Sequence, residues 1–140
     1  MLMELADTSA WTNRRKDPAV MDDFSGRLLA GEIATCPMVE LELLWSARDE
    51  GSMRDLRARL ESLEQIPIEQ REWRRATDVF GELAASGPLH HRQVKLPDLL
   101  VAAAAESAGV AVCHYDAGFD LIAEVTGQPV RAIAPLGSLE

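Results

Sequence analysis

The sequence has few cysteines and contains no long uncharged apolar segment. Its longest apolar stretch, LLVAAAA at residues 99–105, is far too short to span a bilayer. The chain reaches the acidic Glu4 without a cationic stretch, which argues against a secretory signal. Cys36 and Cys113 follow apolar runs and show no CxxC spacing, so we expect reduced, buried side chains in a cytoplasmic protein.

Positive charge is also scarce, because 14 lysines and arginines face 23 acidic residues, giving a net charge of −9. That balance argues against a nonspecific nucleic-acid-binding protein, which would present a basic face. It does not exclude a nuclease, since a metal site built from carboxylates needs negative charge, and it suits a basic protein partner. A chain of 140 residues with 47% hydrophobic content predicts one compact domain over residues 1–140.

Apolar runs and amphipathic stretches alternate along the chain. Strands are predicted at 2–6 (followed by a turn), 32–36, 110–113 and 130–133, with a short extended piece at 64–68. Helices are predicted at 18–30, 37–48, 52–63, 69–85, 97–108 and 117–125, and a polar loop at 89–96. The alternation indicates an α/β domain with a mostly parallel central sheet.

Four acids lie at the edges of apolar runs: Asp7, Glu42, Asp98 and Asp116. Asp7 and Asp116 follow strands, while Glu42 and Asp98 fall in the first turns of helices. Sites in open α/β sheets gather at the carboxyl ends of the strands, so we expect one edge to collect all four. Converging carboxylates would repel each other without a cation, and hard oxygen ligands suit Mg²⁺, with Mn²⁺ as an alternative.

Each acid also has a structural explanation. Asp7 is placed to cap a helix, Asp98 to stabilise a helix N-terminus, and Asp116 to form an Asx turn. Glu42 is harder to explain, because its helix is apolar on most sides. Glu40 points to a different face from Glu42, so at most one of the two belongs to a site.

Three segments carry a resemblance to a known family: LADTSAW, TCPMVELELLWSA and KLPDLLVAAAAESAGVAVCHYDAGFDLIAEVTG. With these segments the chain resembles PIN-domain ribonucleases, specifically the toxin components of VapBC-type toxin–antitoxin systems. The resemblance covers nearly the whole chain. It implies a three-layer α/β/α PIN-like domain, and a Mg²⁺- or Mn²⁺-dependent endoribonuclease acting on structured cellular RNA such as tRNA or rRNA. It also implies a homodimer and a cognate antitoxin that inhibits it.

Carried over residue by residue, the resemblance makes Asp7, Glu42, Asp98 and Asp116 the metal-binding, catalytic acids. Thr8 and Ser9 match the hydroxyls beside the first acid. Many relatives carry a further acid two residues after the position of Asp116, where this chain has Gly118. Asp120 is close enough to supply a carboxylate from a shifted position, although a solvated helix residue is the simpler interpretation. The gap suggests one metal ion before RNA binds.

Other polar residues have weaker signals. His114 precedes the Asp116 turn and is either a substrate contact or a structural residue at the strand end. The loop with His90, His91, Arg92 and Lys95 has the wrong spacing for zinc but offers cations to an RNA backbone.

Arg14, Arg15 and Lys16 are a solvated helix start or an RNA docking patch. Trp11 is either a packing or a base-stacking residue. Trp45 and Trp73 are predicted in the core or at an interface.

Two other functions remain open from sequence alone. The chain is alternatively a catalytically weak PIN-like binding or scaffold module, a hypothesis that Gly118 favours, or a nuclease of similar architecture that acts on DNA. A measurement of metal binding distinguishes the binding module from a ribonuclease. Digestion of RNA beside single-stranded DNA distinguishes a DNA nuclease from a ribonuclease.

Overall fold

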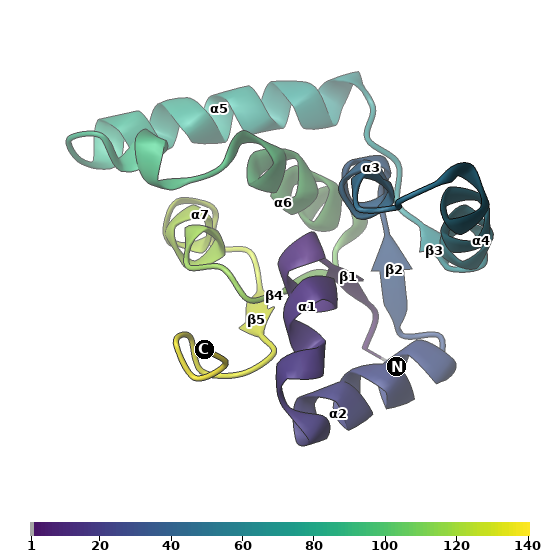
Figure 1. The fold of residues 1–140 in the computed structure, drawn as a ribbon. Coiled ribbons are helices and arrows are strands. Elements are labelled where there is room, and N and C mark those ends of the chain that lie inside the picture. Colours follow the sequence, from purple (N-terminus) through teal and green to yellow (C-terminus); the bar gives the residue numbers. More distant parts are fainter. Residues whose placement is uncertain (1) are drawn as a thin grey trace.

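A five-stranded sheet forms the centre of the protein in this computed structural model, which describes residues 2–140 (Figure 1). The strand order is β3-β2-β1-β4-β5, and every pairing is parallel. The strands are β1 (Glu4–Ala6), β2 (Ile33–Thr35), β3 (Glu64–Gln65), β4 (Ala111–His114) and β5 (Val130–Ala132). The central strand β1 pairs with β2 through Leu5 and Ala34, and with β4 through Leu5 and Val112.

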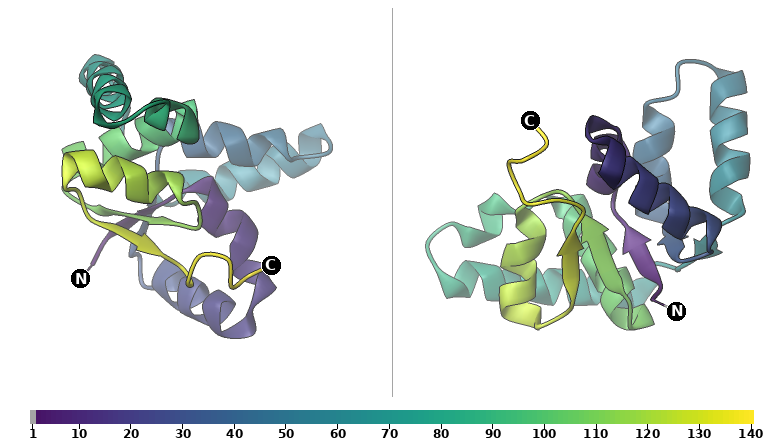
Figure 2. Two further views of the ribbon diagram at one scale, coloured as in Figure 1. Left: turned by 90° about the vertical axis from the view of Figure 1, so that its left-hand side faces the viewer. Right: turned by 90° about the horizontal axis from the view of Figure 1, so that it is seen from below.

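Helices cover both faces of this sheet. They are α1 (Thr8–Asn13), α2 (Pro18–Leu29), α3 (Pro37–Trp45), α4 (Glu50–Glu61), α5 (Gln70–Ser86), α6 (Leu96–Ala108) and α7 (Gly118–Thr126). Figure 2 shows α2 on one side of the sheet and α5, α6 and α7 on the other. The main core lies on the α6 side, where the alanine-rich helix packs against β1 and β4. A smaller core around Phe24 and Ala10 lies under α1 and α2.

The three-layer α/β/α prediction is therefore confirmed, and the sheet is wholly parallel across residues 2–140. Local signals explain the helix boundaries. Asp17 caps α2 by accepting a hydrogen bond from the Ala19 amide, with Pro18 as the first helical residue. Gly109 and Gly127 end α6 and α7 in the left-handed region that glycine adopts without strain.

Some sequence predictions differ from the structure. The turn predicted after the first strand is the short helix α1, and the predicted polar loop contains a 3₁₀ turn over His90–Gln93. Trp45 and Trp73 are 88% and 56% exposed, so their placement in the core is wrong and only an interface remains for them. No helix within residues 2–140 has the length and apolar character needed to cross a membrane.

Candidate functional site

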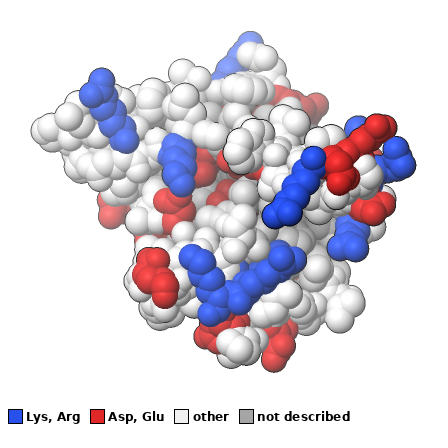
Figure 3. Space-filling view, viewed as in Figure 1, with Lys and Arg blue, Asp and Glu red and all other residues white. Residues whose placement is uncertain are grey.

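All four predicted acids line one pocket at the carboxyl ends of β1 and β4. Asp7 directly follows β1, Asp116 follows β4, Glu42 lies on α3 and Asp98 lies in the first turn of α6. The cavity has a volume of about 250 Å³ and is also lined by Thr8, Ser9, Thr12, Asn13, Lys95 and Tyr115. Figure 3 shows acidic side chains inside a central hollow with basic side chains around it. The parallel sheet thus gathers residues that are far apart in sequence.

Asp7 both caps α1 and faces the pocket. Its Oδ2 accepts hydrogen bonds from the Ser9 amide at 2.9 Å and the Ser9 hydroxyl at 2.6 Å. The Ser9 hydroxyl in turn accepts from the Tyr115 amide, which ties the end of β1 to the segment after β4. Asp7 Oδ1 is buried without a hydrogen-bond partner. Burial raises the pKa of Asp7, and the bonds from Ser9 act against that rise.

Asp98 is buried and makes no capping hydrogen bond, although it lies in the first turn of α6. Its Oδ2 is a second buried oxygen without a partner. Burial, followed by the charges of Asp7 and Asp116, raises the pKa of Asp98 to about 8. Stabilisation of a helix N-terminus is therefore a poor explanation for Asp98, because burial and the neighbouring acids both disfavour its charged form.

Glu42 reaches the pocket from α3 and accepts a 2.9 Å hydrogen bond from the Thr8 hydroxyl. Burial raises the pKa of Glu42, and the Thr8 bond opposes that rise. Glu40 lies outside the pocket, in the electrostatic environment of Glu61 and Arg57. Of the two glutamates on α3, the pocket therefore contains Glu42.

Asp116 forms the predicted Asx turn, because its Oδ1 accepts a 2.9 Å hydrogen bond from the Gly118 amide. Its Oδ2 lies 3.0 Å from the Lys95 ammonium. Burial acts to raise the pKa of Asp116, but the Gly118 bond and Lys95 outweigh burial and lower it. The sequence indicates Lys95 as a loop cation available to an RNA backbone; among residues 2–140 it is the one cationic side chain that lines this pocket.

The donor set fits a hard divalent cation. The two unpartnered oxygens, Asp7 Oδ1 and Asp98 Oδ2, belong to carboxyl groups whose pKa values are both raised, chiefly by burial, and the charge of Asp7 adds to the rise at Asp98. A cation between them would remove both the repulsion and the missing contacts. Within residues 2–140, no group of three or more acidic, histidine or cysteine side chains is arranged to hold a metal ion in the present side-chain positions.

His114 lies beneath the pocket rather than in it. It is fully buried, its Nδ1 accepts a 3.1 Å hydrogen bond from the Asp116 amide, and burial lowers its pKa. The ring packs on Phe119 with centroids 5.1 Å apart. His114 thus supports the backbone that carries Asp116, as expected of a structural residue at a strand end, and has no surface for a substrate.

Asp120 does not reach the pocket. Its side chain is 54% exposed, and its Oδ1 lies 3.9 Å from His114 Nε2. His90 and His91 are also outside, with His90 close to Ser86 and His91 packed on Phe80. The exposed position of Asp120 agrees with its interpretation as a solvated helix residue.

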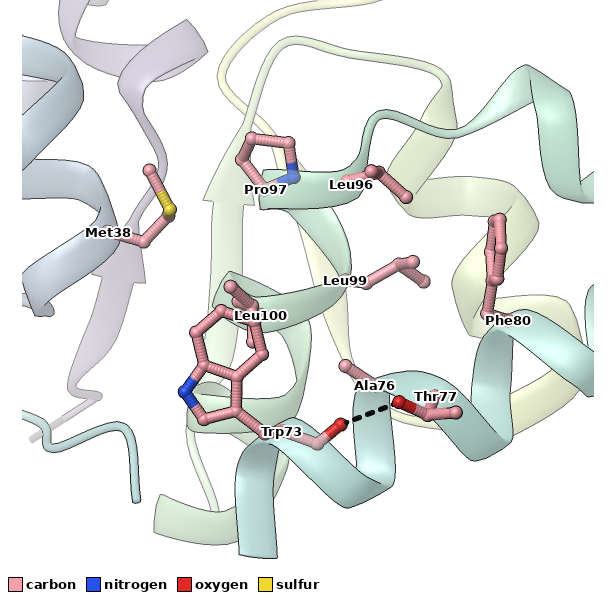
Figure 4. Close-up of a pocket in the computed structure, with 9 residues that line it drawn as sticks. All are labelled: Met38, Trp73, Ala76, Thr77, Phe80, Leu96, Pro97, Leu99 and Leu100. Atoms are coloured by element: carbon pink, nitrogen blue, oxygen red, sulfur yellow. Dashed lines mark hydrogen bonds between the residues drawn. The ribbon is translucent and has the colours of Figure 1, made fainter. Parts of the chain in front are cut away.

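Two further hollows flank the acidic pocket. A groove with an apolar floor and the arginines Arg14, Arg15 and Arg59 runs between α1, α2, α3 and α4. There Trp11 packs edge-on against Phe24, with Arg14 over its ring, as the packing hypothesis predicted. The second groove, of about 350 Å³, is apolar and lies between α3, α5 and α6 (Figure 4).

Comparison with known proteins gives consistent matches. The PIN domain family model matches residues 5–125. Ribonuclease VapC18 of Mycobacterium tuberculosis is 42% identical over 95% of this chain and 96% of its own length. Ribonuclease VapC51 of the same organism is 40% identical over 99% of this chain and 98% of its own length.

Solved structures share the fold. A crystal structure of DNA-bound VapBC from Salmonella typhimurium aligns with a TM-score of 0.69 at 20% identity, covering 96% of this chain and 100% of that chain. VapBC-5 from Mycobacterium tuberculosis, a member of the VapBC family of toxin–antitoxin systems, aligns with a TM-score of 0.59 at 26% identity. That match covers 94% of this chain and 98% of the other.

Proposed function

This chain belongs to the PIN-domain family, and within it to the VapC ribonucleases, and we propose that it is the toxin endoribonuclease of a type II toxin–antitoxin system. Its substrate would be structured cellular RNA in the cytoplasm, such as tRNA or rRNA. The observation that supports this activity best is one pocket with four carboxylates, two of which carry buried oxygens without partners.

Asp7, Glu42, Asp98 and Asp116 would hold the divalent cation, with Mg²⁺ the first choice and Mn²⁺ an alternative. When bound, that cation would activate water and stabilise the leaving oxygen of the phosphodiester. Ser9 holds Asp7, and Thr8 holds Glu42, so each hydroxyl orients one acid toward the pocket. Burial disfavours the charged forms of Asp7 and Asp98, and a bound cation would stabilise those charged forms.

An antitoxin would fit beside this pocket. The groove between α1, α2, α3 and α4 combines apolar side chains with Arg14, Arg15 and Arg59. Such a groove suits a segment with apolar and acidic side chains, and the acidic pocket suits a basic residue from the same partner. Occupation of both surfaces would exclude RNA and metal together.

A second copy of this chain would fit the apolar groove of Figure 4, giving a homodimer. Trp73 and Leu96 line that groove and are 56% and 64% exposed, and Trp45 and Leu41 add further exposed apolar surface on α3. Exposed apolar patches of this kind mark interaction surfaces in soluble chains.

One observation favours the alternative of a catalytically weak binding or scaffold module. Gly118 leaves the α7 side of the pocket without the further acid that many relatives carry. That module would keep the fold and the partner surfaces while binding divalent ions weakly.

The decisive experiment is cleavage of a total cellular RNA pool by the purified chain with Mg²⁺, with Mn²⁺ and with EDTA. Asp7→Asn is the test variant, because asparagine keeps the helix cap and removes the charge. Asp17→Asn is the matched control, since Asp17 caps α2 with the same type of hydrogen bond outside the pocket.

We expect discrete metal-dependent products from the wild type and from Asp17→Asn, and none from Asp7→Asn. Equal behaviour of all three proteins would favour the scaffold module. Faster digestion of single-stranded DNA than of RNA in the same assay would favour a DNA nuclease.

A further inference from the structure

The chain contains two lysines, Lys16 and Lys95, and one of them reaches into the acidic pocket. Lys95 immediately precedes α6, and its ammonium lies 3.0 Å from Asp116 Oδ2. The charges of Asp98 and Asp7 also act on this ammonium. Lys95 is therefore a counter-charge to the acidic side chains of this pocket.

The Lys95 contact occupies Oδ2, one of the two carboxylate oxygens of Asp116. Its Oδ1 already accepts a hydrogen bond from the Gly118 amide in the Asx turn at the start of α7. Its Oδ2 is paired with Lys95. A cation that binds Asp116 through Oδ2 must therefore displace the lysine, and one that binds through the second lone pair of Oδ1 would be repelled by the nearby ammonium.

Displacement of the lysine costs less than breaking the turn. The Lys95 side chain is 74% exposed, whereas that of Asp116 is 21% exposed. A long, exposed ammonium regains its hydration when it leaves, and exposed ion pairs are weak. The Asx turn, by contrast, fixes the backbone that leads into α7.

We propose that Lys95 is a tethered cation that competes with the divalent ion for Asp116 and leaves this carboxylate when the metal binds. This inference rests on the metal dependence in the proposed function. It gives Lys95 a regulatory role: it offsets part of the negative charge of the metal-free pocket and weakens metal affinity, so fewer sites are occupied at low divalent concentration.

Calorimetric titration with Mn²⁺, without RNA, tests the competition. Lys95→Met removes the charge and keeps a long side chain, and Lys95→Arg keeps the charge. Lys16→Met is the matched control, because it causes the same change in net charge outside the pocket. We expect Lys95→Met to bind Mn²⁺ about three- to tenfold more tightly than the wild type, the size of effect expected for losing one partly exposed charge contact.

The Mn²⁺ affinities of Lys95→Arg and Lys16→Met should stay within about twofold of the wild-type affinity. Circular dichroism verifies that each variant is folded. Equal Mn²⁺ affinities in Lys95→Met and the wild type would overturn the proposal, as would equal tightening by Lys16→Met. Absence of binding in every protein would instead reject the metal dependence of the proposed function.

Amine acetylation followed by mass spectrometry gives an independent readout. With only Lys16 and Lys95 as side-chain amines, Lys16 serves as an internal reference. Saturating Mn²⁺ should raise the acetylation rate of Lys95 relative to Lys16, because the amine loses its ion pair. An unchanged or lower ratio would contradict the exchange.

Discussion

The Thr8 hydroxyl donates a 2.9 Å hydrogen bond to the Glu42 carboxylate and so joins α1 to α3 across the acidic pocket. Glu42 otherwise lies between apolar residues on its helix, where burial and the charge of Asp7 both raise its pKa. The hydroxyl therefore holds a carboxylate that its surroundings disfavour. This contact also explains why a threonine directly follows the first acid.

Thr8→Val should separate this orienting role from simple packing, because valine has a similar shape and no hydroxyl. We expect a loss of about 1 kcal/mol in the free energy of unfolding, and a fall of roughly tenfold in RNA cleavage, as for lost supporting contacts around metal ligands. Urea denaturation and initial cleavage rates measure the two effects. Thr8→Ser, which keeps the hydroxyl, should retain most activity; equal loss in both variants would contradict the orienting role.

Stability in the absence of metal should fall as pH rises from about 6.5 to 8. Asp98 has a folded pKa of about 8, raised first by burial, whereas an unfolded aspartate ionises near 3.9. Between these values the folded chain binds more protons, so the free energy of unfolding falls by up to about 1.4 kcal/mol per pH unit. The raised pKa of Asp7 acts in the same direction.

The range starts at about pH 6.5 so that His114 does not contribute to the slope. Burial lowers the pKa of His114, so its protonation destabilises the fold only as pH falls below about 6.5. Thermal melts in EDTA at several pH values measure the slope. We expect Asp98→Asn to flatten it and to be the more stable protein at pH 8. A wild-type melting temperature that rises over this range would refute the assignment. Saturating Mn²⁺ should also reduce the slope.

The sequence predicted the convergence of Asp7 and Asp116 because both follow parallel strands, whose carboxyl ends must share one edge. Glu42 and Asp98 followed from helix positions next to apolar runs. Sequence alone did not reveal that Lys95 pairs with Asp116, since the direction of a long side chain depends on the loop before α6. It also left open whether Trp45 and Trp73 lie in the core or at an interface, because an apolar helical residue looks the same whether its neighbour is the core or another molecule.

Gly118 can be used to test how many ions the pocket accepts. A Cβ atom at this position would lie 3.3 Å from Asp116 Oδ1 and 3.5 Å from Asp98 Oδ2, so a carboxylate there would enter the pocket. We expect Mn²⁺ titration to give a stoichiometry of about one for the wild type and closer to two for Gly118→Asp. Gly118→Asn controls for the added atoms. A clean stoichiometry of two in the wild type would reject the single-ion hypothesis.

Trp73 should be the side chain that decides dimer formation. It lines the apolar groove between α3, α5 and α6 with its side chain largely exposed, and burying an aromatic ring there would contribute strongly to association. Trp73→Glu places a charge in that interface, so we expect a monomer where the wild type is a dimer. Light scattering after gel filtration over a range of concentrations measures the mass.

Arg74→Glu is the matched control for Trp73→Glu, since Arg74 is exposed on the same helix and does not line the groove. It should leave the dimer intact, although it adds the same negative side chain and changes the net charge more. Trp73→Phe should also remain dimeric, because it keeps an aromatic ring in the groove. If Trp73→Glu still dimerises, the interface does not lie in this groove. The exposed Trp45 on α3 would then be the next residue to substitute.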